Sequence, residues 1–322
     1  MIPASVGRRT DRLDVHVSSA EHEGARTAGA GWTMERRDGV DLIGVIGGGT
    51  MGAGIAEVCA RAGSRVVVVE SDDSAAERCR SRIGSSLQRA VNRGRLAAEE
   101  AERALADIDV ATELGAVAAA DMVIEAVPEI ESVKLDLFRR LDAILRPEAV
   151  LASNTSSIPL VKMASVTGRA DRVVGLHFFN PAPVLPLVEV VESLLTSQET
   201  LLAVTDFAEK RLGKTTIRSK DRAGFIVNAL LIPYLLSAIR MLESGFATAA
   251  DIDAGMVQGC AHPQGPLALA DLIGLDTTAA VAQSMYEEFK EPLYAAPPLL
   301  LRMVDAGLLG RKTGRGFFPY AA

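Results

Sequence analysis

The chain has 322 residues, of which 48% are hydrophobic and 23% are charged, and its formal net charge is −7. Because a single hydrophobic core stops growing near about 250–300 residues, this length predicts two domains. The acidic balance argues against a general nucleic-acid-binding protein, which needs a basic face to displace counterions, but leaves room for a local basic spot that binds a small anion.

The remaining composition points to a cytoplasmic protein without metal or membrane anchor. Cys59, Cys79 and Cys260 form no C-x-x-C pair, and so sparse and odd a set favours a reducing cytoplasm over a disulfide framework. Clustered metal ligands are absent from the sequence. An uninterrupted apolar run of about 18 residues is also absent, so we expect no membrane span. No apolar segment of the signal-peptide type follows Arg8-Arg9.

Residues 1–39 differ in composition from everything after them. This segment mixes Ser, Gly, Ala and charges of both signs without sustained periodicity, which predicts a disordered tail. Met34 is a candidate for the true start of the protein, and a regulatory or docking role is the alternative interpretation.

Residues 40–222 alternate between strand and helix signals. Short apolar runs predict strands near residues 41–49, 64–71, 120–129, 149–157 and 172–181. Helical spacing separates them, at residues 50–63, 75–106 and 132–145. Strands that alternate with helices predict an α/β domain with a parallel, doubly wound sheet.

Residues 223–322 carry helix signals and few strand signals. Helices are expected near residues 225–245, 248–260, 270–289 and 297–310. The first of them is apolar around most of its circumference, which predicts burial on several faces. The sequence therefore predicts a smaller, all-helical C-terminal domain.

A glycine-rich turn joins the first expected strand to the first expected helix. Gly47, Gly49 and Gly52 give the pattern G-x-G-x-x-G, in which they permit the tight turn, the approach of a pyrophosphate and the packing of helix on strand. Thr50 and Met51 lie within this turn, where the helix N-terminus offers free N–H groups to phosphates.

An acidic residue supports this interpretation of the turn. Glu70 ends the next strand, where a carboxylate accepts hydrogen bonds from ribose hydroxyls and repels a 2′-phosphate. NAD is therefore favoured over NADP, although Arg65 and Arg78 lie close by in sequence and weaken the preference.

His177 and Glu189 form the second candidate site. A lone histidine among apolar neighbours is more often a satisfied core residue, but His177 stands at the carboxyl end of a strand, the edge where open α/β sheets bind ligands. Glu189 lies in the apolar run PLVEVVE, where a charge is costly unless it is paired. A buried acid beside an imidazole fixes its tautomer and stabilises the imidazolium, which suits a base that removes the proton of an alcohol during hydride transfer.

Six ordered segments together resemble one enzyme family. They are GVIGGGTMGAGIAEVCARAG, ASNTSS, GLHFFNPAPV with LVEVV, GFIVNALLIPYLLSAI, HPQGPLALADLIGLD and LGRKTGRGFF. In this order they are similar to the short-chain L-3-hydroxyacyl-CoA dehydrogenases, including bacterial 3-hydroxybutyryl-CoA dehydrogenases. The resemblance runs from about residue 40 to the C-terminus, and implies a Rossmann domain, a helical domain that forms a homodimer, and NAD as cofactor.

The resemblance also implies roles for individual residues. His177 matches the family's catalytic base and Glu189 its orienting acid, while Ser156 and Asn228 match the residues that place the substrate. On the cofactor side the matches are Glu129, Lys134 and Lys312, and for the nucleotide end of CoA they are Ser86 and Arg93.

Several of these residues have simpler interpretations. Ser156 could end a strand, and Asn228 could cap or bridge helices, although an amide in so apolar a segment needs a partner. Glu129 and Lys134 could form an ordinary surface pair, and Arg93, with Arg89 and Arg95 nearby, a solvated helix face.

Two departures from the family pattern leave the preferred acyl chain and carrier open. Gln264 stands where relatives commonly have methionine, and Leu185-Pro186 replaces a frequent Met-Lys pair. His262 is expected to shape a turn before Pro263 and to take no part in chemistry.

The resulting prediction is an NAD-dependent dehydrogenase of L-3-hydroxyacyl thioesters. One alternative keeps the chemistry but takes the acyl group from an acyl carrier protein, as in the synthesis of polyketide extender units. A crystallin-like sugar-acid dehydrogenase fits ASNTSS less well, and a non-catalytic NAD(H)-binding protein is the alternative from another class.

Overall fold

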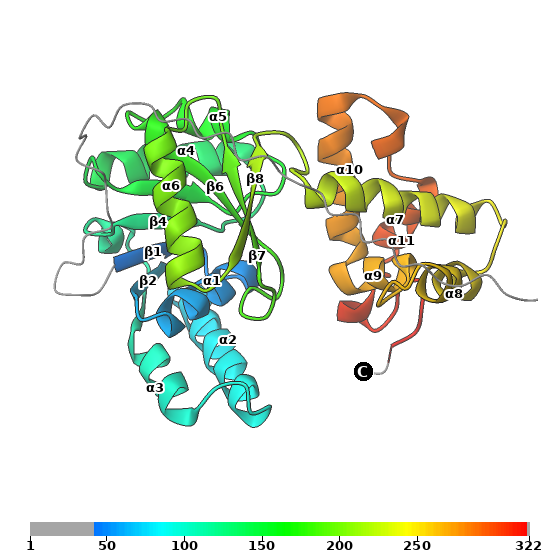
Figure 1. Ribbon diagram of the computed structural model, residues 1–322, viewed down its shortest axis with the longest axis horizontal. Helices are drawn as coiled ribbons and strands as arrows, with labels where there is room; N and C mark the ends of the chain where they lie inside the picture. Colours follow the sequence, from blue (N-terminus) through cyan, green and yellow to red (C-terminus); the bar gives the residue numbers. More distant parts are fainter. Residues whose placement is uncertain (1–41, 321–322) are drawn as a thin grey trace, which may run out of the picture. The chain divides into compact units, whose positions relative to one another are not determined.

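The computed structural model describes residues 42–320, so the predicted tail over residues 1–39 lies outside the described part of the chain. The first part of the described chain is α/β (Figure 1). Its strands are β1 (Leu42–Ile46), β2 (Arg65–Val69), β3 (Ile108–Ala111), β4 (Met122–Glu125), β5 (Val150–Ser153), β6 (Val173–Phe178), β7 (Leu187–Glu192) and β8 (Thr215–Lys220). Its α-helices are α1 (Thr50–Arg61), α2 (Asp73–Asn92), α3 (Ala98–Ala106), α4 (Glu131–Ile144), α5 (Leu160–Ala164) and α6 (Gln198–Asp206), the last continued by a π-helical turn, η3 (Phe207–Arg211).

The eight strands form one sheet in the order β3-β2-β1-β4-β5-β6-β7-β8. Strands β1 to β6 are parallel, and their order 3-2-1-4-5-6 is that of a Rossmann fold. β7 runs antiparallel to β6, and β8 runs parallel to β7. The expected doubly wound sheet is confirmed, with two further strands at one edge.

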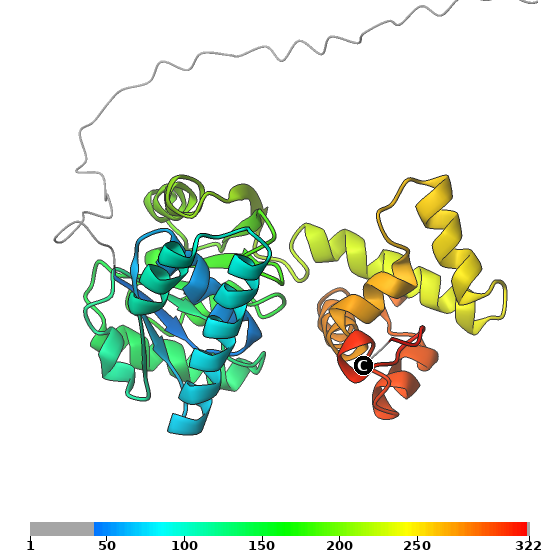
Figure 2. The ribbon, with the colours of Figure 1, turned by 90° about the horizontal axis from the view of Figure 1, so that it is seen from below.

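Helices cover both faces of this sheet because its parallel strands are apolar on both faces. On one face, Ile55 of α1, Ile83 of α2 and Leu201 of α6 pack against alternate strand residues. On the other face, Phe138 of α4 and Met163 of α5 pack against the remaining strand residues. Helices α1, α2 and α3 contact one another on the first face (Figure 2). This double layer leaves the carboxyl strand ends free to carry a site.

The rest of the described chain is helical. It comprises α7 (Val227–Glu243), α8 (Ala249–Gly259), α9 (Pro266–Ile273), α10 (Leu275–Phe289) and α11 (Pro298–Asp305), with short 3-10 turns and two isolated bridges near residues 310–319. Leu235, Leu236 and Ile239 of α7 are buried in a separate core that includes Leu267 and Ala282. The predicted helical C-terminal region is therefore confirmed.

Some expected elements were wrong in detail. The helix expected over residues 75–106 is two helices, because the chain turns at Gly94 with a φ of 65°. The helix expected over residues 270–289 is interrupted at Gly274, whose φ is 104°. Helix α7 buries Leu235, Leu236 and Ile239, whereas Leu230 is 74% exposed. Strands β3, β7 and β8 had no expected counterpart.

The three cysteines are free thiols. Within residues 42–320 no helix has the length and apolar character that a membrane span requires.

Candidate active site

The glycine turn has the geometry that its sequence pattern predicts. Gly47 has a φ of 90°, in the left-handed region that favours glycine. A Cβ atom on Gly52 would lie 1.7 Å from the carbonyl oxygen of Gly47, so only glycine lets α1 pack against the turn. A Cβ on Gly49 would meet no atom within 4 Å, so open space lies over its backbone. Gly48, which the pattern leaves free, is also constrained, because its Cβ would lie 2.3 Å from Cys79 Sγ.

The acid at the end of β2 lies directly beside this turn. Glu70 Oε1 accepts a hydrogen bond of 2.8 Å from the backbone N–H of Gly48. The Glu70 side chain lines a cavity of about 1160 Å³ together with Gly47, Gly49, Thr50 and Met51. One cavity thus contains the turn and the carboxylate.

The two basic residues that weakened the predicted preference for NAD lie in different places. Arg65 begins β2, at the opposite end of the strand from Glu70, and pairs with Asp109 at 4.0 Å. Arg78 does line the cavity, where its guanidinium donates to the Ser74 hydroxyl. Of these two arginines, Arg78 therefore shares the cavity with Glu70, as do Arg82 and Arg140.

His177 and Glu189 are a direct cross-strand pair. Their strands β6 and β7 are antiparallel, and the register sets these two residues opposite each other. His177 Nδ1 lies 2.7 Å from Glu189 Oε2, and the two residues are 6% and 0% exposed. The contact predicted from the sequence is present.

The Glu189 carboxylate is held from its other side by helix α7. Its Oε1 accepts hydrogen bonds from the backbone N–H groups of Ile226 (3.1 Å) and Val227 (3.0 Å), at the start of that helix. Free N–H groups and the positive end of the helix dipole both stabilise a carboxylate there. An ionised carboxylate only accepts hydrogen bonds, so His177 Nδ1 must carry the proton that they share. The lone pair of a neutral imidazole is then on Nε2, which has no hydrogen bond within residues 42–320.

Two aromatic rings fix the plane of the imidazole. The Phe179 ring centroid lies 4.7 Å from that of His177 and the Phe225 centroid 5.5 Å, both edge-on. Phe225 has a φ of 47°, a left-handed conformation that is strained for a residue with a bulky side chain. Such strain persists only where the surrounding structure imposes it, and here it brings the ring to the histidine.

A second set of buried charges lies at the ends of β4 and β5. Lys134 of α4 is 1% exposed, and its Nζ lies 3.0 Å from a Glu125 carboxylate oxygen and 2.7 Å from Glu129 Oε2. The alternative of an ordinary surface pair between Glu129 and Lys134 is therefore wrong. Glu125 also accepts a hydrogen bond from the Ser153 hydroxyl at 2.5 Å. Every charge in this set has a partner inside the protein.

The two carboxyl groups of this set have pKa values displaced in opposite directions. Burial raises the pKa of Glu125 above its ordinary 4.5, although Lys134 opposes the shift. Burial would raise the pKa of Glu129 as well, but Lys134 and the hydroxyls of Thr155 and Ser157 together hold it below 4.5. Of the two carboxyl groups, the more exposed Glu129 therefore keeps its negative charge to the lower pH.

Glu129 fixes the turn that carries Ser156. Its Oε1 accepts hydrogen bonds from the Thr155 and Ser157 hydroxyls and from the backbone N–H groups of Ser156 and Ser157. The Ser156 hydroxyl has no hydrogen bond within the described residues and is half-buried. Its backbone is thus immobilised while its hydroxyl remains available.

Asn228 follows directly on the residue that anchors Glu189. It is half-buried in the first turn of α7, and its side-chain amide has no hydrogen bond in the part of the chain that the structure describes. The simpler interpretation, in which this amide caps or bridges helices, is therefore wrong. Its two donors and one carbonyl are free for a ligand.

The remaining candidates lie apart from these groups. Ser86 of α2 and Arg93 line one cavity of about 300 Å³, together with Arg89 and Arg95, so the basic cluster does face a cavity. Lys312 is in the helical part, where its Nζ contacts Asp276 Oδ2 at 2.5 Å. It does not line the cavity of the glycine turn.

Sequence reasoning missed three residues of the site. They are Glu125, which pairs with Lys134; Asn154, whose Oδ1 accepts the backbone N–H of Phe178 at 2.8 Å; and Phe225. The acid in the apolar segment DMVIEAV was a detectable signal, because a charge there needs a partner. The left-handed backbone of a phenylalanine has no sequence signal.

The residues around the turn fit NAD. The open space over Gly49 admits a pyrophosphate, and the Glu70 carboxylate stands where a ribose diol donates. β6 lies three strands from β1, which at about 4.8 Å per strand is about 14 Å. A ligand that occupies the turn and reaches His177 must extend across the strand ends, as a dinucleotide does. No group of three or more potential metal ligands occurs within residues 42–320.

Comparison with known proteins gives two family matches that together cover the described chain. Residues 42–222 match the model described as "3-hydroxyacyl-CoA dehydrogenase, NAD binding domain". Residues 224–320 match the model described as "3-hydroxyacyl-CoA dehydrogenase, C-terminal domain".

Individual relatives are similar over nearly their whole length. A 3-hydroxybutyryl-CoA dehydrogenase of Mycobacterium tuberculosis is 54% identical over 284 residues, which are 88% of this chain and 99% of the relative. The crystal structure of M. tuberculosis FadB2 is also 54% identical and has a TM-score of 0.86, over 88% of this chain and 99% of that one. The crystal structure of (S)-3-hydroxybutyryl-CoA dehydrogenase PaaH1 from Ralstonia eutropha is 44% identical, with a TM-score of 0.82, over 88% of this chain and 100% of that one.

Proposed function

The chain belongs to the 3-hydroxyacyl-CoA dehydrogenase family and is an NAD-dependent oxidoreductase, and we propose that it interconverts a short-chain L-3-hydroxyacyl-CoA, such as 3-hydroxybutyryl-CoA, with the 3-oxoacyl-CoA. The names of the relatives in M. tuberculosis and R. eutropha support the short chain, and the second supports the S configuration. The observation that carries the proposal is the hydrogen bond between His177 and Glu189 at the carboxyl end of β6.

His177 is the proposed base. With the proton held on Nδ1 by Glu189, its Nε2 lone pair takes the hydroxyl proton of the substrate. Without that transfer the product would be a protonated ketone, which is much higher in energy. Glu189 then stabilises the imidazolium by charge, and the backbone N–H groups at the start of α7 hold the carboxylate in place for this task.

NAD, when bound, supplies the hydride acceptor. Gly47, Gly49 and Gly52, with Thr50 and Met51, would hold its pyrophosphate, and Glu70 its adenosine ribose. Glu129 and Lys134 are proposed at the nicotinamide ribose, and Lys312 is proposed as a further cofactor contact from the helical part. The partial exposure of the Glu129 side chain, 36%, supports its contact with a ligand.

The free side chains beside the histidine are the proposed substrate contacts. Ser156 and Asn228 would hold the hydroxyl and the thioester carbonyl, because both have unused donors. Ser86 and Arg93 would bind the nucleotide end of CoA, and the cavity that they share with two further arginines supports this assignment.

The region after residue 222 is the proposed site of dimer formation. Leu230 and Met241 lie eleven residues apart on α7, which sets them on the same face of the helix, and they are 74% and 41% exposed. Phe246, just beyond that helix, is 80% exposed. Leu230→Glu is expected to shift the molar mass measured by light scattering from dimer to monomer.

Three free thiols also agree with a reducing compartment such as the cytoplasm.

The alternative substrates carry less support. The family matches and the relatives are named for CoA thioesters, so an acyl-carrier-protein substrate is not favoured. A non-catalytic protein would have no use for a base whose tautomer is fixed by a buried acid.

The test is the oxidation of NADH followed by its absorbance. We expect fast turnover with acetoacetyl-CoA, slower turnover as the 3-oxoacyl chain lengthens, and little with NADPH. Weak turnover of the CoA thioester beside fast turnover of the carrier-bound one would overturn the proposed substrate.

A further inference from the structure

We propose that a cavity at the C-terminal end of α1, apart from the glycine turn and the histidine, binds an organic phosphate of the adenine nucleotide type. Its volume is about 330 Å³, and it is lined by residues of α1, α3 and the turn between η3 and β8. Four cationic side chains and one acidic side chain line it: Arg61, Arg103, Arg211, Lys214 and Glu100.

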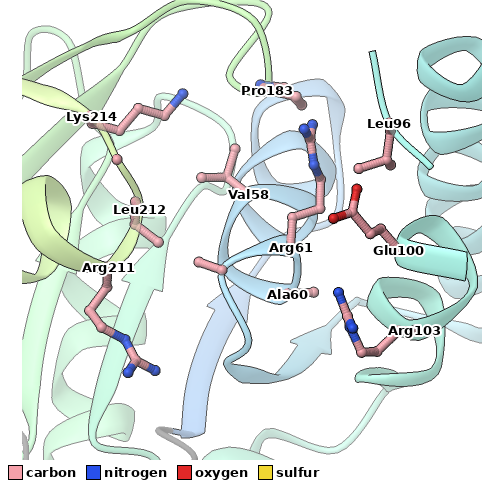
Figure 3. A pocket seen from close by; sticks show the side chains of 12 residues that line it. Val58, Ala60, Arg61, Leu96, Glu100, Arg103, Pro183, Arg211, Leu212 and Lys214 are labelled. Carbon is pink, nitrogen blue, oxygen red and sulfur yellow. The ribbon is translucent and has the colours of Figure 1, made fainter. Parts of the chain in front are cut away.

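The cavity combines apolar side chains with charge on two sides. Figure 3 shows Val58 between two groups of side chains, with Lys214, Leu212 and Arg211 on one side and Arg61, Ala60 and Arg103 on the other. Apolar side chains suit the face of a planar base, and the cations beside them suit phosphate oxygens. A purely inorganic anion would leave the apolar lining without a partner.

Two of the cations are held in place by the protein interior. Arg61 Nη1 lies 3.3 Å from Oε1 of Glu57, which is 1% exposed. Lys214 Nζ donates to the carbonyl oxygens of Ala182 (2.7 Å) and Leu185 (2.8 Å). Groups fixed in this way lose little conformational entropy when a ligand binds, unlike the long side chains of an open surface.

Of the two fixed cations, Lys214 has no carboxylate partner within residues 42–320, whereas Arg61 pairs with Glu57. Burial and the neighbouring Arg61 guanidinium lower the pKa of Lys214 below its ordinary 10.5. A phosphate beside Lys214 would supply the missing negative charge, since Glu100 already caps α3 by accepting the backbone N–H of Ala97 at 3.3 Å. This positive cavity occurs in a chain whose net charge is −7.

The cavity differs from the one lined by Ser86 and Arg93. The two share Arg61 and Pro183, but Arg103, Arg211 and Lys214 line only the first. An adenine nucleotide could come from two sources, the carrier end of the CoA substrate or a separate nucleotide that regulates the enzyme. Both present the same chemistry to the cavity.

The test is ADP binding, measured by calorimetry on the full chain saturated with NADH so that the glycine turn is not available to ADP. Arg103→Gln is expected to weaken ADP binding about tenfold, since it removes a charge-assisted hydrogen bond. Arg103 is exposed, so this variant should fold. Lys214→Gln should weaken ADP binding as well. Arg218→Gln, on the exposed surface of β8, is the matched control and should bind ADP like the wild type.

Saturation with CoA separates the two sources. If the nucleotide belongs to the substrate, CoA displaces ADP, and Arg103→Gln raises the KM for acetoacetyl-CoA but not for acetoacetyl-pantetheine. If it is a separate nucleotide, ADP still binds and that KM is unchanged.

The site is disproved if ADP does not bind the NADH-saturated enzyme, or if Arg103→Gln and Lys214→Gln bind it like the wild type. It is equally disproved if only Arg93→Gln weakens binding. Turnover of acetoacetyl-CoA, measured alongside, reports on the proposed function independently.

Discussion

Two sets of charged side chains lie at the carboxyl ends of neighbouring strands. They differ in whether every hydrogen-bonding group of the set has a partner within the described residues. At the ends of β4 and β5, Lys134 contacts both Glu125 and Glu129, and the carboxylates are further satisfied by hydroxyl and backbone donors. At the β6–β7 pair, Glu189 is equally satisfied, but it holds one nitrogen of His177 and leaves the other without a partner in the described part of the chain.

This difference indicates that the two sets have different roles, one structural and one in proton transfer. A charge set that is complete within the protein can shape a turn but has no group left to exchange a proton. A set that ends in one free, oriented nitrogen has such a group. We therefore expect substitutions at the first set to act on stability and on NAD binding, and substitutions at the second to act mainly on turnover.

The largest expected effect is that of His177→Ala on turnover. Removal of the general base should lower kcat with acetoacetyl-CoA on the order of 10³- to 10⁴-fold, while the affinity for NADH stays near that of the wild type. His262→Ala is the matched control, because this histidine contacts Tyr234 in the helical region and is expected to leave kcat unchanged. Near-normal turnover of His177→Ala would contradict the expectation that the β6–β7 pair acts on turnover.

Lys134→Met should act on stability instead. It keeps the volume of the side chain but leaves the buried Glu125 and the partly exposed Glu129 without their cation, which should lower the free energy of unfolding by about 3 kcal/mol. Denaturant unfolding measures this loss. The exposed i,i+4 pair of Lys210 with Asp206 provides the control, since Lys210→Met should cost less than about 1 kcal/mol. Equal losses in the two variants would show that the buried set has no special structural role.

Glu189→Gln should lower kcat about 10²-fold with little change in stability. The amide can turn its NH₂ toward His177, which transfers the shared proton to Nε2 and removes the base, or toward the N–H groups of Ile226 and Val227, which then lose their acceptor. Steady-state kinetics and a thermal melt on the same sample separate these effects. A Glu189→Gln variant with a much lower melting temperature but a normal kcat would show that the role of Glu189 is structural.

The smallest expected effect is the pH dependence that Glu129 contributes. Its pKa is lowered in the folded state, so its contribution to stability is present above the unfolded value of 4.5 and is lost as the pH falls through the folded value. Glu125, with a raised pKa, contributes in the opposite direction. Glu129→Gln should therefore lose less free energy of unfolding than the wild type below pH 4.5. If Glu129→Gln instead lost more free energy of unfolding than the wild type below pH 4.5, the lowered pKa of Glu129 in the folded state would be contradicted.

The sequence predicted the parts of the fold and site that depend on local pattern. The glycine turn was predictable because each glycine answers a local steric need, as Gly47 and Gly52 do. The pairing of His177 with Glu189 was predictable from the cost of a charge in an apolar run, and the antiparallel register of β6 and β7 now explains their separation of twelve residues.

The remainder depends on contacts between distant segments. Strand β8 is half-exposed and weakly apolar, and it is defined by its pairing with β7. The anchoring of Glu189 by α7 joins residues 37 and 38 positions apart, and no short pattern encodes it. The left-handed Phe225 follows from the same contact between segments.

The most direct test of the central claim, that Glu189 acts through His177, is a double-variant cycle on kcat. If the claim holds, His177→Ala with Glu189→Gln is no slower than His177→Ala alone, because an orienting acid has no effect once its imidazole is absent. If the two losses multiply, Glu189 contributes to turnover independently of the histidine, and the account of the site is contradicted.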